Sequence, residues 1–380
     1  MPGPGQSGKG RRPGSGRPAP ETVVVGGGGE RAAAFAASCA ELGWPVPTFC
    51  SWRDAFDAGL HARVADGPLL RIDSPSDDPA NDAWLVELGG GSPPPTGALL
   101  PFDAWYAGLA RVLTRIDEQS RHLRSRLQNP SELRMMFDKE FTAQTLHNAG
   151  VPVPESFSTT DAAGDTVDGT ELLARARAAG WSQAIVKPRY GSSASGLVAL
   201  RWHGDRIIAR STVEVTDAGC YNSRRLQTYR DGRAIRLLDA LSRQPLRLER
   251  WIPKMSLDGA TADFRVVVIG GRARHVLLRC AHGPFTNLHL GARRGNVATA
   301  RAELGGRYVD VLGTAEDAVA CFPDTWYAGV DVLVPRQGRA RVVEVNAFGD
   351  FHTGVRWRGL DTYQCELRTF VAARGNRFDA

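Results

Sequence analysis

The chain has 380 residues, of which 42% are hydrophobic and 23% charged, so it can hold two or three domains with ample cores. No apolar run approaches the roughly 18 residues that a membrane-spanning helix needs, and residues 1–20 lack the apolar segment of a secretory signal. Four of the positive charges behind the net charge of +6 lie in that Gly/Pro-rich tail, which contains no acid, so a nucleic-acid partner is not expected.

Two glycine-rich segments near the start resemble phosphate-binding motifs without meeting their requirements. Gly3 to Gly10 nearly spells the phosphate-binding loop, but Gly10 stands where a Ser or Thr would bind Mg²⁺, and no strand precedes it. Thr22 to Gly29, followed by a helical run from Arg31 to Leu42, predicts a strand, a glycine turn and a helix. Arg31 stands where the dinucleotide fingerprint needs its third glycine, so we expect an α/β unit without a dinucleotide.

Alternating short apolar runs and helical patterns over residues 21 to about 115 predict an α/β unit with a mostly parallel sheet. Helices are predicted from Trp105 to Arg126, from Glu132 to Asn148 and from Glu171 to Ala179. The strands predicted after them cover residues 184–187, 197–202, 206–209, 246–251, 264–269 and 275–279. Later helices are predicted at residues 298–304, 314–321 and 359–373.

A loop of small residues lies between two predicted strands in residues 182–200. Lys187 ends the first strand, and the loop that follows consists of Gly191, Ser192, Ser193, Ala194, Ser195 and Gly196. Small residues let backbone N–H groups and hydroxyls approach a polyphosphate, while a nearby ammonium group neutralises its charge. A glycine- and serine-rich turn is often only a turn, but the lysine at the end of a hydrophobic strand favours phosphate binding.

A β-hairpin near the end of the chain carries a cluster of oxygen ligands. The apolar runs 330–334 and 341–345 predict its strands; Asp331 lies in the first, and Glu344 and Asn346 lie at the end of the second. Glu344 and Asn346 are two residues apart and therefore share one face of their strand, where Asp331 can join them across the ladder. Two carboxylates and an amide oxygen form the hard ligand set that Mg²⁺ prefers. The alternative is a pair of edge-strand acids facing solvent.

Three further segments place polar side chains beside predicted strands. Leu246 to Lys254 brings apolar Trp251 and Ile252 next to backbone that can contact a purine edge. Asp263 and Arg265, two residues apart, share one face of the strand that follows. The polar segment 283–295 contains Asn287, His289, Arg293 and Arg294.

In this order, the segments from about 132 to 350 resemble the ATP-grasp superfamily. Their spacing is similar to the glutamate-ligase and glutathione-synthetase-like branch, in a bacterial subgroup apart from the well-studied ligases. The resemblance implies an α/β (α+β) fold, in which a disordered tail (1–20) and an N-terminal α/β pre-grasp domain (21–130) precede a two-lobed ATP-grasp fold. Residues 131–255 would form the small lobe with the phosphate-binding loop, and residues 256–375 the large lobe with the Mg²⁺ site.

The same resemblance implies a role for each matching residue. Lys139 and Lys187 match the two lysines near the α- and β-phosphates of ATP, and Gly191, Ser192, Ser193, Ser195 and Gly196 match the loop that covers these phosphates. Arg250, Trp251 and Ile252 match the adenine hinge, with Asp263 at the ribose or nucleotide position. Asp331, Glu344 and Asn346 match the ligands of one or two Mg²⁺ ions, with Mn²⁺ as an alternative, and Asn287 matches the asparagine near the γ-phosphate.

The sequence departs from the family pattern at several of these positions. Relatives often carry Glu where this chain has Arg250, and Ala194 stands where a glycine is common, so the loop is expected to be stiffer. Phe285 occupies the place of an arginine that stabilises the transferring phosphoryl group, and Arg265, Arg279 or Arg293 would have to substitute for it. Residues 347–352 are bulkier than the small residue and Pro-Gly that relatives carry after the metal asparagine.

The resemblance implies an ATP-dependent carboxylate–amine ligase that activates a carboxylate as an acyl phosphate. An amine then displaces phosphate, and the substrates would be a small-molecule or peptide carboxylate and an amine. Two alternatives stay open: an ATP-dependent kinase of the same fold, and a non-catalytic ATP-binding protein. His352 is either a substrate contact or base, or a packing residue, and Arg356 and Arg358 either face an anionic substrate or lie in solvent.

The six cysteines are scattered through the sequence without a C-x-x-C pair. This argues against a zinc ribbon, a redox motif and a disulfide framework, and it favours a reducing cytoplasm as the protein's location. Neither a membrane partner nor a nucleic-acid partner is expected, and a homo-oligomer stays open.

Overall fold

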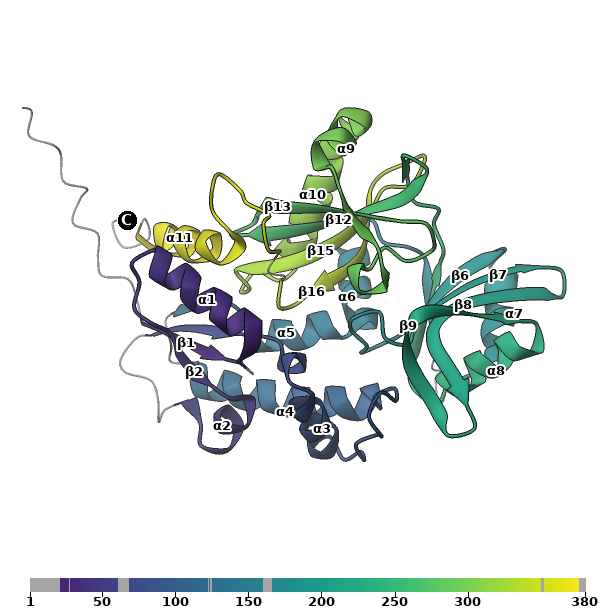
Figure 1. Cartoon of the computed structure of the whole chain (residues 1–380), viewed down its shortest axis with the longest axis horizontal. Helices are drawn as coiled ribbons and strands as arrows, with labels where there is room; N and C mark the ends of the chain where they lie inside the picture. The colour runs from purple at the N-terminus through teal and green to yellow at the C-terminus, as the bar shows by residue number, and fades with distance from the viewer. Residues whose placement is uncertain are drawn as a thin grey trace, which may run out of the picture.

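The computed structural model describes residues 21–26, 28–60, 68–121, 123, 125–159, 166–349 and 352–375, and arranges them around three β-sheets (Figure 1). The tail prediction for residues 1–20, including the segment from Gly3 to Gly10, lies outside the described residues. The predicted α/β (α+β) class is confirmed, because one sheet is parallel and the other two are antiparallel. None of the described helices is both long and apolar enough to cross a bilayer.

The N-terminal sheet is parallel, as predicted, in the order β2-β1-β3-β4. Its strands are β1 (Thr22–Val25), β2 (Thr48–Cys50), β3 (Leu69–Ile72) and β4 (Ser125–Arg126). The helices around it are α1 (Gly29–Glu41), α2 (Trp52–Asp57), α3 (Pro79–Leu88) and α4 (Phe102–Ser120). The prediction that α4 reaches Arg126 is wrong: the helix ends at Ser120, because the backbone of residues 125–126 pairs with β3.

Two helices replace the single helix predicted from Glu132 to Asn148. They are α5 (Pro130–Phe137) and α6 (Lys139–Asn148), and they are separated at Asp138. The Asp138 backbone is extended, and its carboxylate accepts hydrogen bonds from the backbone N–H groups of Glu140 and Phe141, each at 3.1 Å. An N-cap satisfies N–H groups that a helix start leaves unpaired, so this break is stable. It places Lys139 at the first residue of α6.

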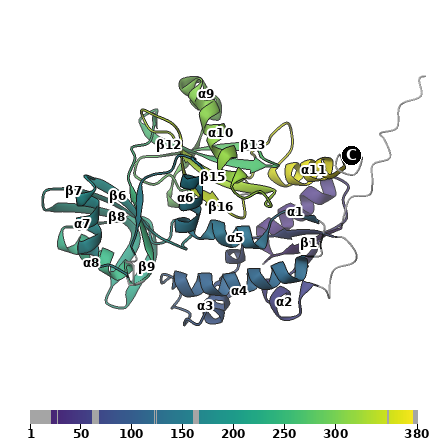
Figure 2. The ribbon, with the colours of Figure 1, turned by 180° about the vertical axis from the view of Figure 1, so that it is seen from behind.

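The middle sheet is antiparallel, in the order β5-β10-β6-β7-β8-β9, and α7 and α8 lie beside it (Figures 1 and 2). Its strands are β5 (Ser156–Ser158), β6 (Gln183–Pro188), β7 (Val198–His203), β8 (Arg206–Thr216), β9 (Gly219–Arg230) and β10 (Leu246–Arg250). The helices α7 (Gly169–Ala178) and α8 (Gly232–Leu241) share a hydrophobic core with this sheet. β9 was not predicted, because its polar side chains conceal the strand periodicity. The helix α8 was not predicted either, and β8 extends beyond the predicted residue 209.

The third sheet is antiparallel, in the order β14-β13-β12-β15-β16, with β11 paired to β12. Its strands are β11 (Ser256–Leu257), β12 (Ala260–Ile269), β13 (Arg272–Ala281), β14 (Arg293–Gly295), β15 (Tyr327–Leu333) and β16 (Arg341–Asn346). The later helices are α9 (Val297–Leu304), α10 (Arg307–Ala320), which begins before the predicted residue 314, and α11 (Thr362–Gly375). The predicted hairpin is confirmed: in β15 and β16, Asp331 lies directly opposite Glu344, and Gly329 opposite Asn346.

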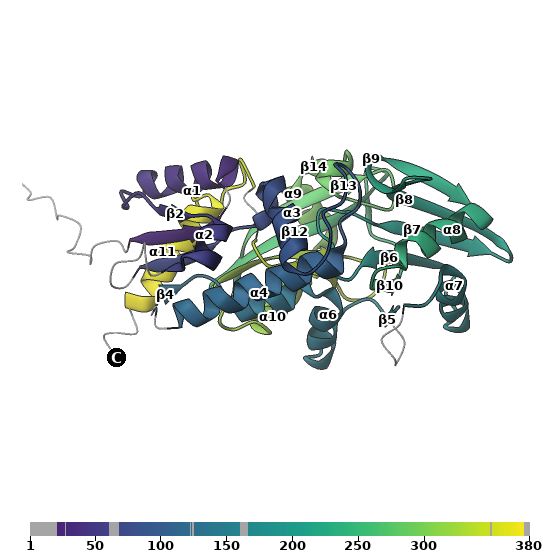
Figure 3. The same cartoon turned by 90° about the horizontal axis from the view of Figure 1, so that it is seen from below.

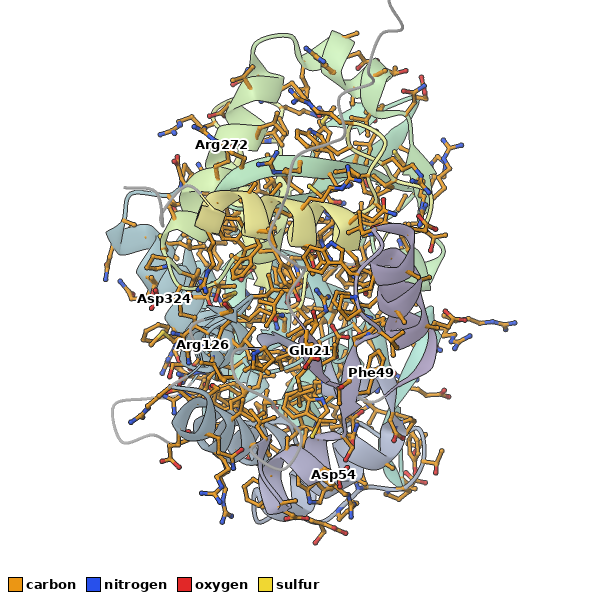
Figure 4. All side chains as sticks on the ribbon, turned by 90° about the vertical axis from the view of Figure 1, so that its left-hand side faces the viewer. Glu21, Phe49, Asp54, Arg126, Arg272 and Asp324 are labelled. Carbon is orange, nitrogen blue, oxygen red and sulfur yellow. The ribbon has the colours of Figure 1, made fainter. Side chains whose placement is uncertain are left out.

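The helix α11 connects the N-terminal sheet to the third sheet. It contacts both α1 and β12. The end view of the molecule shows it next to α1 (Figure 4), and the view from below shows it behind the strands of the N-terminal sheet (Figure 3). A buried arginine, Arg71 on β3, lies at this junction with 1% of its surface exposed. Its guanidinium group forms a 2.9 Å ion pair with Asp73 and a second ion pair with Glu366 of α11. The rings of Phe35, Tyr327 and Tyr363 surround it at 4.5–4.9 Å.

Stability at this junction is expected to depend on pH through Glu366. Burial raises the pKa of Glu366 to about 7 from an ordinary 4.5, although Arg71 opposes the rise. Between these two values the folded chain holds a proton that the unfolded chain has released, so the stabilisation is complete below pH 4.5 and is lost as the pH rises to about 7. Relative to Glu366→Gln, the unchanged chain should lose up to about 3 kcal/mol of unfolding free energy over this window.

Urea unfolding of both chains at several pH values measures that difference. Glu316→Gln, at a partly exposed ion pair with Arg272, is the control and should run parallel to the unchanged chain. A Glu366→Gln difference that stays constant with pH would show that the carboxyl group is ionised throughout.

Candidate functional site

A cavity of about 500 Å³ is lined by residues of the middle sheet, the third sheet and the loop after β6. Most of the residues predicted for the site line it together, and they are Lys139, Lys187, Gly191, Ser192, Ser193, Ser195, Arg250, Trp251, Ile252, Asp263, Arg265, Arg279, Asn287, Asp331, Glu344 and Asn346. Gly196 and Arg293 are not among the lining residues. Arg293 lies on the edge strand β14 with an exposed side chain, so it is not placed to substitute for the missing family arginine.

Two carboxylates on neighbouring strands of the third sheet share one arginine. Arg279 on β13 pairs with Asp263 on β12 at 2.9 Å and with Asp331 on β15 at 3.2 Å. Asp331 also pairs with Arg265, and Asp263 with Lys254 at 2.6 Å. Asp263, predicted at the ribose or nucleotide position, therefore belongs to the same ion-pair network as Asp331, the predicted metal ligand.

The charges of this network are mutually stabilised although the groups are buried. Burial alone would raise the pKa of Asp331, but Arg265 and Arg279 outweigh it and hold that pKa well below its ordinary value. Burial would likewise raise the pKa of Asp263, and Lys254 and Arg279 lower it. For Arg279, the two carboxylates overcome the effect of burial and raise its pKa. Both carboxylates are therefore ionised at neutral pH.

A second set of ion pairs joins the middle sheet to β16. Lys139 of α6 lies 3.0 Å from Glu344, and Lys187 of β6 lies 2.7 Å from Glu249 of β10. Lys187 also donates to the carbonyl of Val343 on β16 at 3.1 Å. Burial would raise the pKa of Glu344, but Lys139 and Lys187 lower it, so this carboxylate is also ionised. Two lysines that are far apart in sequence thus approach the same carboxyl-bearing strand.

The loop of small residues after β6 covers one side of the cavity. Lys139 donates a hydrogen bond to the carbonyl of Gly191, and the Ser195 hydroxyl donates to the Asn222 side chain at 2.7 Å. Ser193 and Ala194 have φ values of 52° and 62°, in the left-handed region that favours glycine. The departure noted at Ala194 therefore falls at a position where a Cβ atom is costly.

Replacing Ala194 by glycine should remove this backbone strain. We expect Ala194→Gly to raise the free energy of unfolding by up to about 1 kcal/mol, because the left-handed penalty for alanine exceeds the entropy that glycine adds to the unfolded chain. Ala174→Gly, at an exposed interior position of α7, is the matched control and should lower it by about 0.5–1 kcal/mol. Urea unfolding compares the two, and a loss of stability in both would mean that Ala194 is not strained.

The predicted adenine hinge lies at the end of β10. The Arg250 side chain pairs at 3.2 Å with Glu155, and both are more than half exposed, so the arginine that replaces the family glutamate is directed to the surface. The Gln183 side chain donates to the Trp251 carbonyl at 3.0 Å, and the guanidinium group of Arg201 lies 4.3 Å from the Trp251 ring centroid. Contacts within the protein therefore hold Trp251 in place.

The predicted γ-phosphate segment lies at the same cavity. Asn287 and Phe285 both line it, and Phe285 is buried. Phe285 carries no charge and cannot stabilise a transferring phosphoryl group. Among the described lining residues of the third sheet, Arg265 and Arg279 are the arginines that could do so. Both are already held by Asp331.

Several lining residues were not predicted. Lys254, Glu249 and Thr286 complete the ion-pair network, and Lys254 donates to the Thr286 hydroxyl at 2.6 Å. Residues of the N-terminal α/β unit also line the cavity, namely Arg31, Ser74 and Ser76. The sequence signal for Glu249 is its position two residues after Arg247, with which it pairs at 2.9 Å; no comparable local pattern marks Ser74 or Ser76.

The cavity carries an excess of positive charge. Among its described lining residues, leaving aside Arg250 whose side chain is directed to the surface, the cations are Arg31, Lys139, Lys187, Lys254, Arg265 and Arg279, and the carboxylates are Glu249, Asp263, Asp331 and Glu344. Such a balance favours an anionic ligand. Within the described part of the chain no three His, Cys, Asp or Glu side chains form a metal-binding group. Asp331, Glu344 and Asn346 nevertheless offer the hard oxygen donors that Mg²⁺ accepts together with phosphates.

Comparison with known proteins gives similarity at the level of the fold. No family model matches the sequence, and no curated protein matches it. The ATP-grasp ligase PsnB, solved with a phosphomimetic variant of its minimal precursor, Mg and ADP, aligns with 94% of this chain and 100% of its own at a TM-score of 0.51 and 17% identity.

Two further solved structures agree. D-cycloserine synthetase DcsG aligns with 94% of this chain and 98% of its own at a TM-score of 0.50 and 14% identity. The ADP complex of purK, an N5-carboxyaminoimidazole ribonucleotide synthetase, aligns with 93% of this chain and 78% of its own at a TM-score of 0.56 and 12% identity. The chain therefore has the ATP-grasp fold, as its sequence motifs predict.

Proposed function

We propose that the protein is an ATP-dependent carboxylate–amine ligase of the glutamate-ligase and glutathione-synthetase-like branch. The observation that carries this proposal is the cavity itself, where Lys139 and Lys187 approach Glu344 while Arg265 and Arg279 hold Asp331. Phosphate-binding cations, ionised carboxylates and arginines thus meet in one place within the ATP-grasp fold. In this proposal residues 21–130 form the pre-grasp domain, and residues 131–255 and 256–375 the two lobes.

The nucleotide is held between the two antiparallel sheets. Lys139 and Lys187 bind the α- and β-phosphates, and Gly191, Ser192, Ser193, Ser195 and Gly196 close over them. The adenine lies against the backbone of Arg250, Trp251 and Ile252. In the structure the two lysines pair with Glu344 and Glu249. ATP binding replaces these carboxylates with phosphate oxygens as the partners of the lysines.

The residues that would hold one or two Mg²⁺ ions, or Mn²⁺, are Asp331, Glu344 and Asn346. Their fit rests on three oxygen donors on facing strands, with Asp331 directly opposite Glu344 and both carboxylates ionised. A metal ion held there would supply positive charge that neutralises the phosphates. Lys139, Arg265 and Arg279, which pair with these carboxylates in the structure, would bind the phosphates if a metal ion were held there.

Catalysis comes from positioning and charge neutralisation. Arg265 and Arg279 offset the charge that develops on the transferring phosphoryl group, Asn287 contacts it, and Asp263 fixes Arg279 in place. A substrate carboxylate oxygen attacks the γ-phosphorus and ADP leaves. The amine then attacks the acyl carbon, phosphate leaves with the bonding electrons, and an amide remains.

The acid substrate is a small-molecule or peptide carboxylate, and the reaction takes place in the cytoplasm. The peptide alternative is supported by PsnB, the ATP-grasp ligase solved with its minimal precursor. The N-terminal unit contributes Arg31, Ser74 and Ser76 to the lining, and these residues would contact that substrate.

The test is ADP release by the purified chain with Mg·ATP and pooled amino acids and small carboxylates, with and without hydroxylamine. Hydroxylamine traps an acyl phosphate as a hydroxamate, so ADP together with hydroxamate is the expected result. ADP without hydroxamate would instead indicate a kinase. ATP binding without ADP release would indicate either a macromolecular substrate that the pools do not contain or a non-catalytic ATP-binding protein, and Phe285 in the family arginine position would explain the second.

A further inference from the structure

The imidazole of His352 has an unpaired nitrogen in the wall of the cavity. His352 is 7% exposed, and its Nε2 atom is buried without a hydrogen-bond partner. Five other buried side-chain N or O atoms of the described residues also lack a partner, but none of their residues lines the cavity. A buried polar atom without a partner costs about 1–3 kcal/mol, so its retention at a ligand cavity points to a ligand contact.

The surroundings of His352 determine which contact it can make. Arg265 of β12, Arg279 of β13 and Arg294 of β14 face it, and Asp331 of β15 is the nearby acid. Arg294 also donates to the carbonyl of Thr353 at 2.6 Å, which holds the segment in place. Burial, together with these arginines, lowers the pKa of His352 to about 3, so the ring is uncharged at neutral pH. An uncharged imidazole has one nitrogen that accepts a hydrogen bond.

We propose that His352 Nε2 accepts the proton of the attacking amine. This inference rests on the proposed ligase function and extends it to the second half of the reaction. The arginines repel an ammonium ion but not an uncharged amine, whose N–H group finds an acceptor in Nε2. The amine nitrogen bonds to the acyl carbon, the bond from that carbon to the phosphate oxygen breaks, and the phosphate oxygen keeps the electron pair. The amine proton passes to Nε2 and then to phosphate or solvent.

The bound substrates favour this transfer. In the absence of ligand the arginines act against a charge on His352, but the negative charges of ADP and acyl phosphate offset them and raise the proton affinity of the imidazole. The arginines meanwhile bind the anions, since a guanidinium group suits phosphate oxygens. In this wall of the cavity, the arginines thus bind the anions and His352 accepts the proton.

The test uses His352→Gln, which keeps polarity and approximate size but loses the basic nitrogen. Hydroxylamine is uncharged at neutral pH and strongly nucleophilic, so it needs little help in losing its proton. We therefore expect hydroxamate formation from the carboxylate pool to stay near the unchanged rate, while amide formation with the amino-acid pool falls about 10²–10⁴-fold. Raising the pH should restore part of the amide rate.

His275→Gln is the matched control. His275 is also buried with an unpartnered nitrogen, Nδ1, and burial also lowers its pKa, but it does not line the cavity. Its substitution should leave the ratio of amide to hydroxamate unchanged. If His352→Gln does not fold, as judged by thermal shift with Mg·ATP, His352→Asn replaces it.

Equal losses of amide and hydroxamate, or no loss of either, would overturn the role of His352 while leaving the ligase function intact. ADP release without hydroxamate by the unchanged chain would instead overturn the ligase function, and this inference with it.

Discussion

Glu344→Gln is expected to reduce ADP release at least ~10²–10³-fold, the effect of removing one electrostatic stabiliser from an active site. Glu344 lies directly opposite Asp331 and 3.0 Å from Lys139, so in our proposal it is both a metal ligand and the partner that positions a phosphate-binding lysine. Glutamine keeps the shape of the side chain and loses its charge. The measurement is the rate of ADP release across a Mg²⁺ titration, with an increased Mg²⁺ requirement as part of the expected result.

The control for this substitution is Glu171→Gln. Glu171 forms a 2.9 Å pair with Arg175 on the surface of α7, where the loss of charge costs about 0.3–0.5 kcal/mol and should leave turnover unchanged. Thermal unfolding of both variants separates lost chemistry from lost folding. A folded Glu344→Gln variant with near-normal turnover would remove Glu344 from the site.

Arg71→Met is expected to lower the free energy of unfolding by about 3–5 kcal/mol. Above about pH 7, where Glu366 is ionised in the folded chain, Arg71 is the positive group between Asp73 and Glu366, and these buried carboxylates would be left without it. Methionine fills a similar volume between the aromatic rings, so the loss comes mainly from the uncompensated carboxylates. Urea unfolding measures it, since the slope of the transition also reports whether the sheets still unfold together.

Arg175→Met tests the same change at the exposed pair with Glu171, where a loss below about 1 kcal/mol is expected. Above about pH 7, the double variant Arg71→Met with Glu366→Gln should be less destabilised than the sum of the two single changes, because the second removes a charge that the first leaves unpaired. Strict additivity would mean that Arg71 and Glu366 are not coupled.

The hairpin with Asp331, Glu344 and Asn346 was predictable because alternation along a strand fixes which side chains share a face. The ATP-grasp fold was predictable because several motifs occur in one order. The break at Asp138 was hidden inside a continuous helical pattern, and its cap becomes visible only when its carboxylate is seen to accept from the following N–H groups.

Contacts between residues that are far apart in sequence account for most of the site geometry that could not be predicted. Lys187 and Glu249 are far apart in sequence and meet only because β6 and β10 are neighbours in the middle sheet. The same applies to Arg279, whose bridge between Asp263 and Asp331 needs three strands in register. The unpaired nitrogen of His352 is likewise a property of its packing and not of any local pattern.

The cavity lies at the boundary between two hydrophobic cores. The middle sheet shares one core with α7 and α8, whereas a second core contains residues of both the N-terminal and third sheets. A ligand held by Lys187 on one side and Asp331 on the other acts as a non-covalent cross-link between them. Its binding energy is then available to couple the unfolding of the two cores, which would merge separate thermal transitions into one.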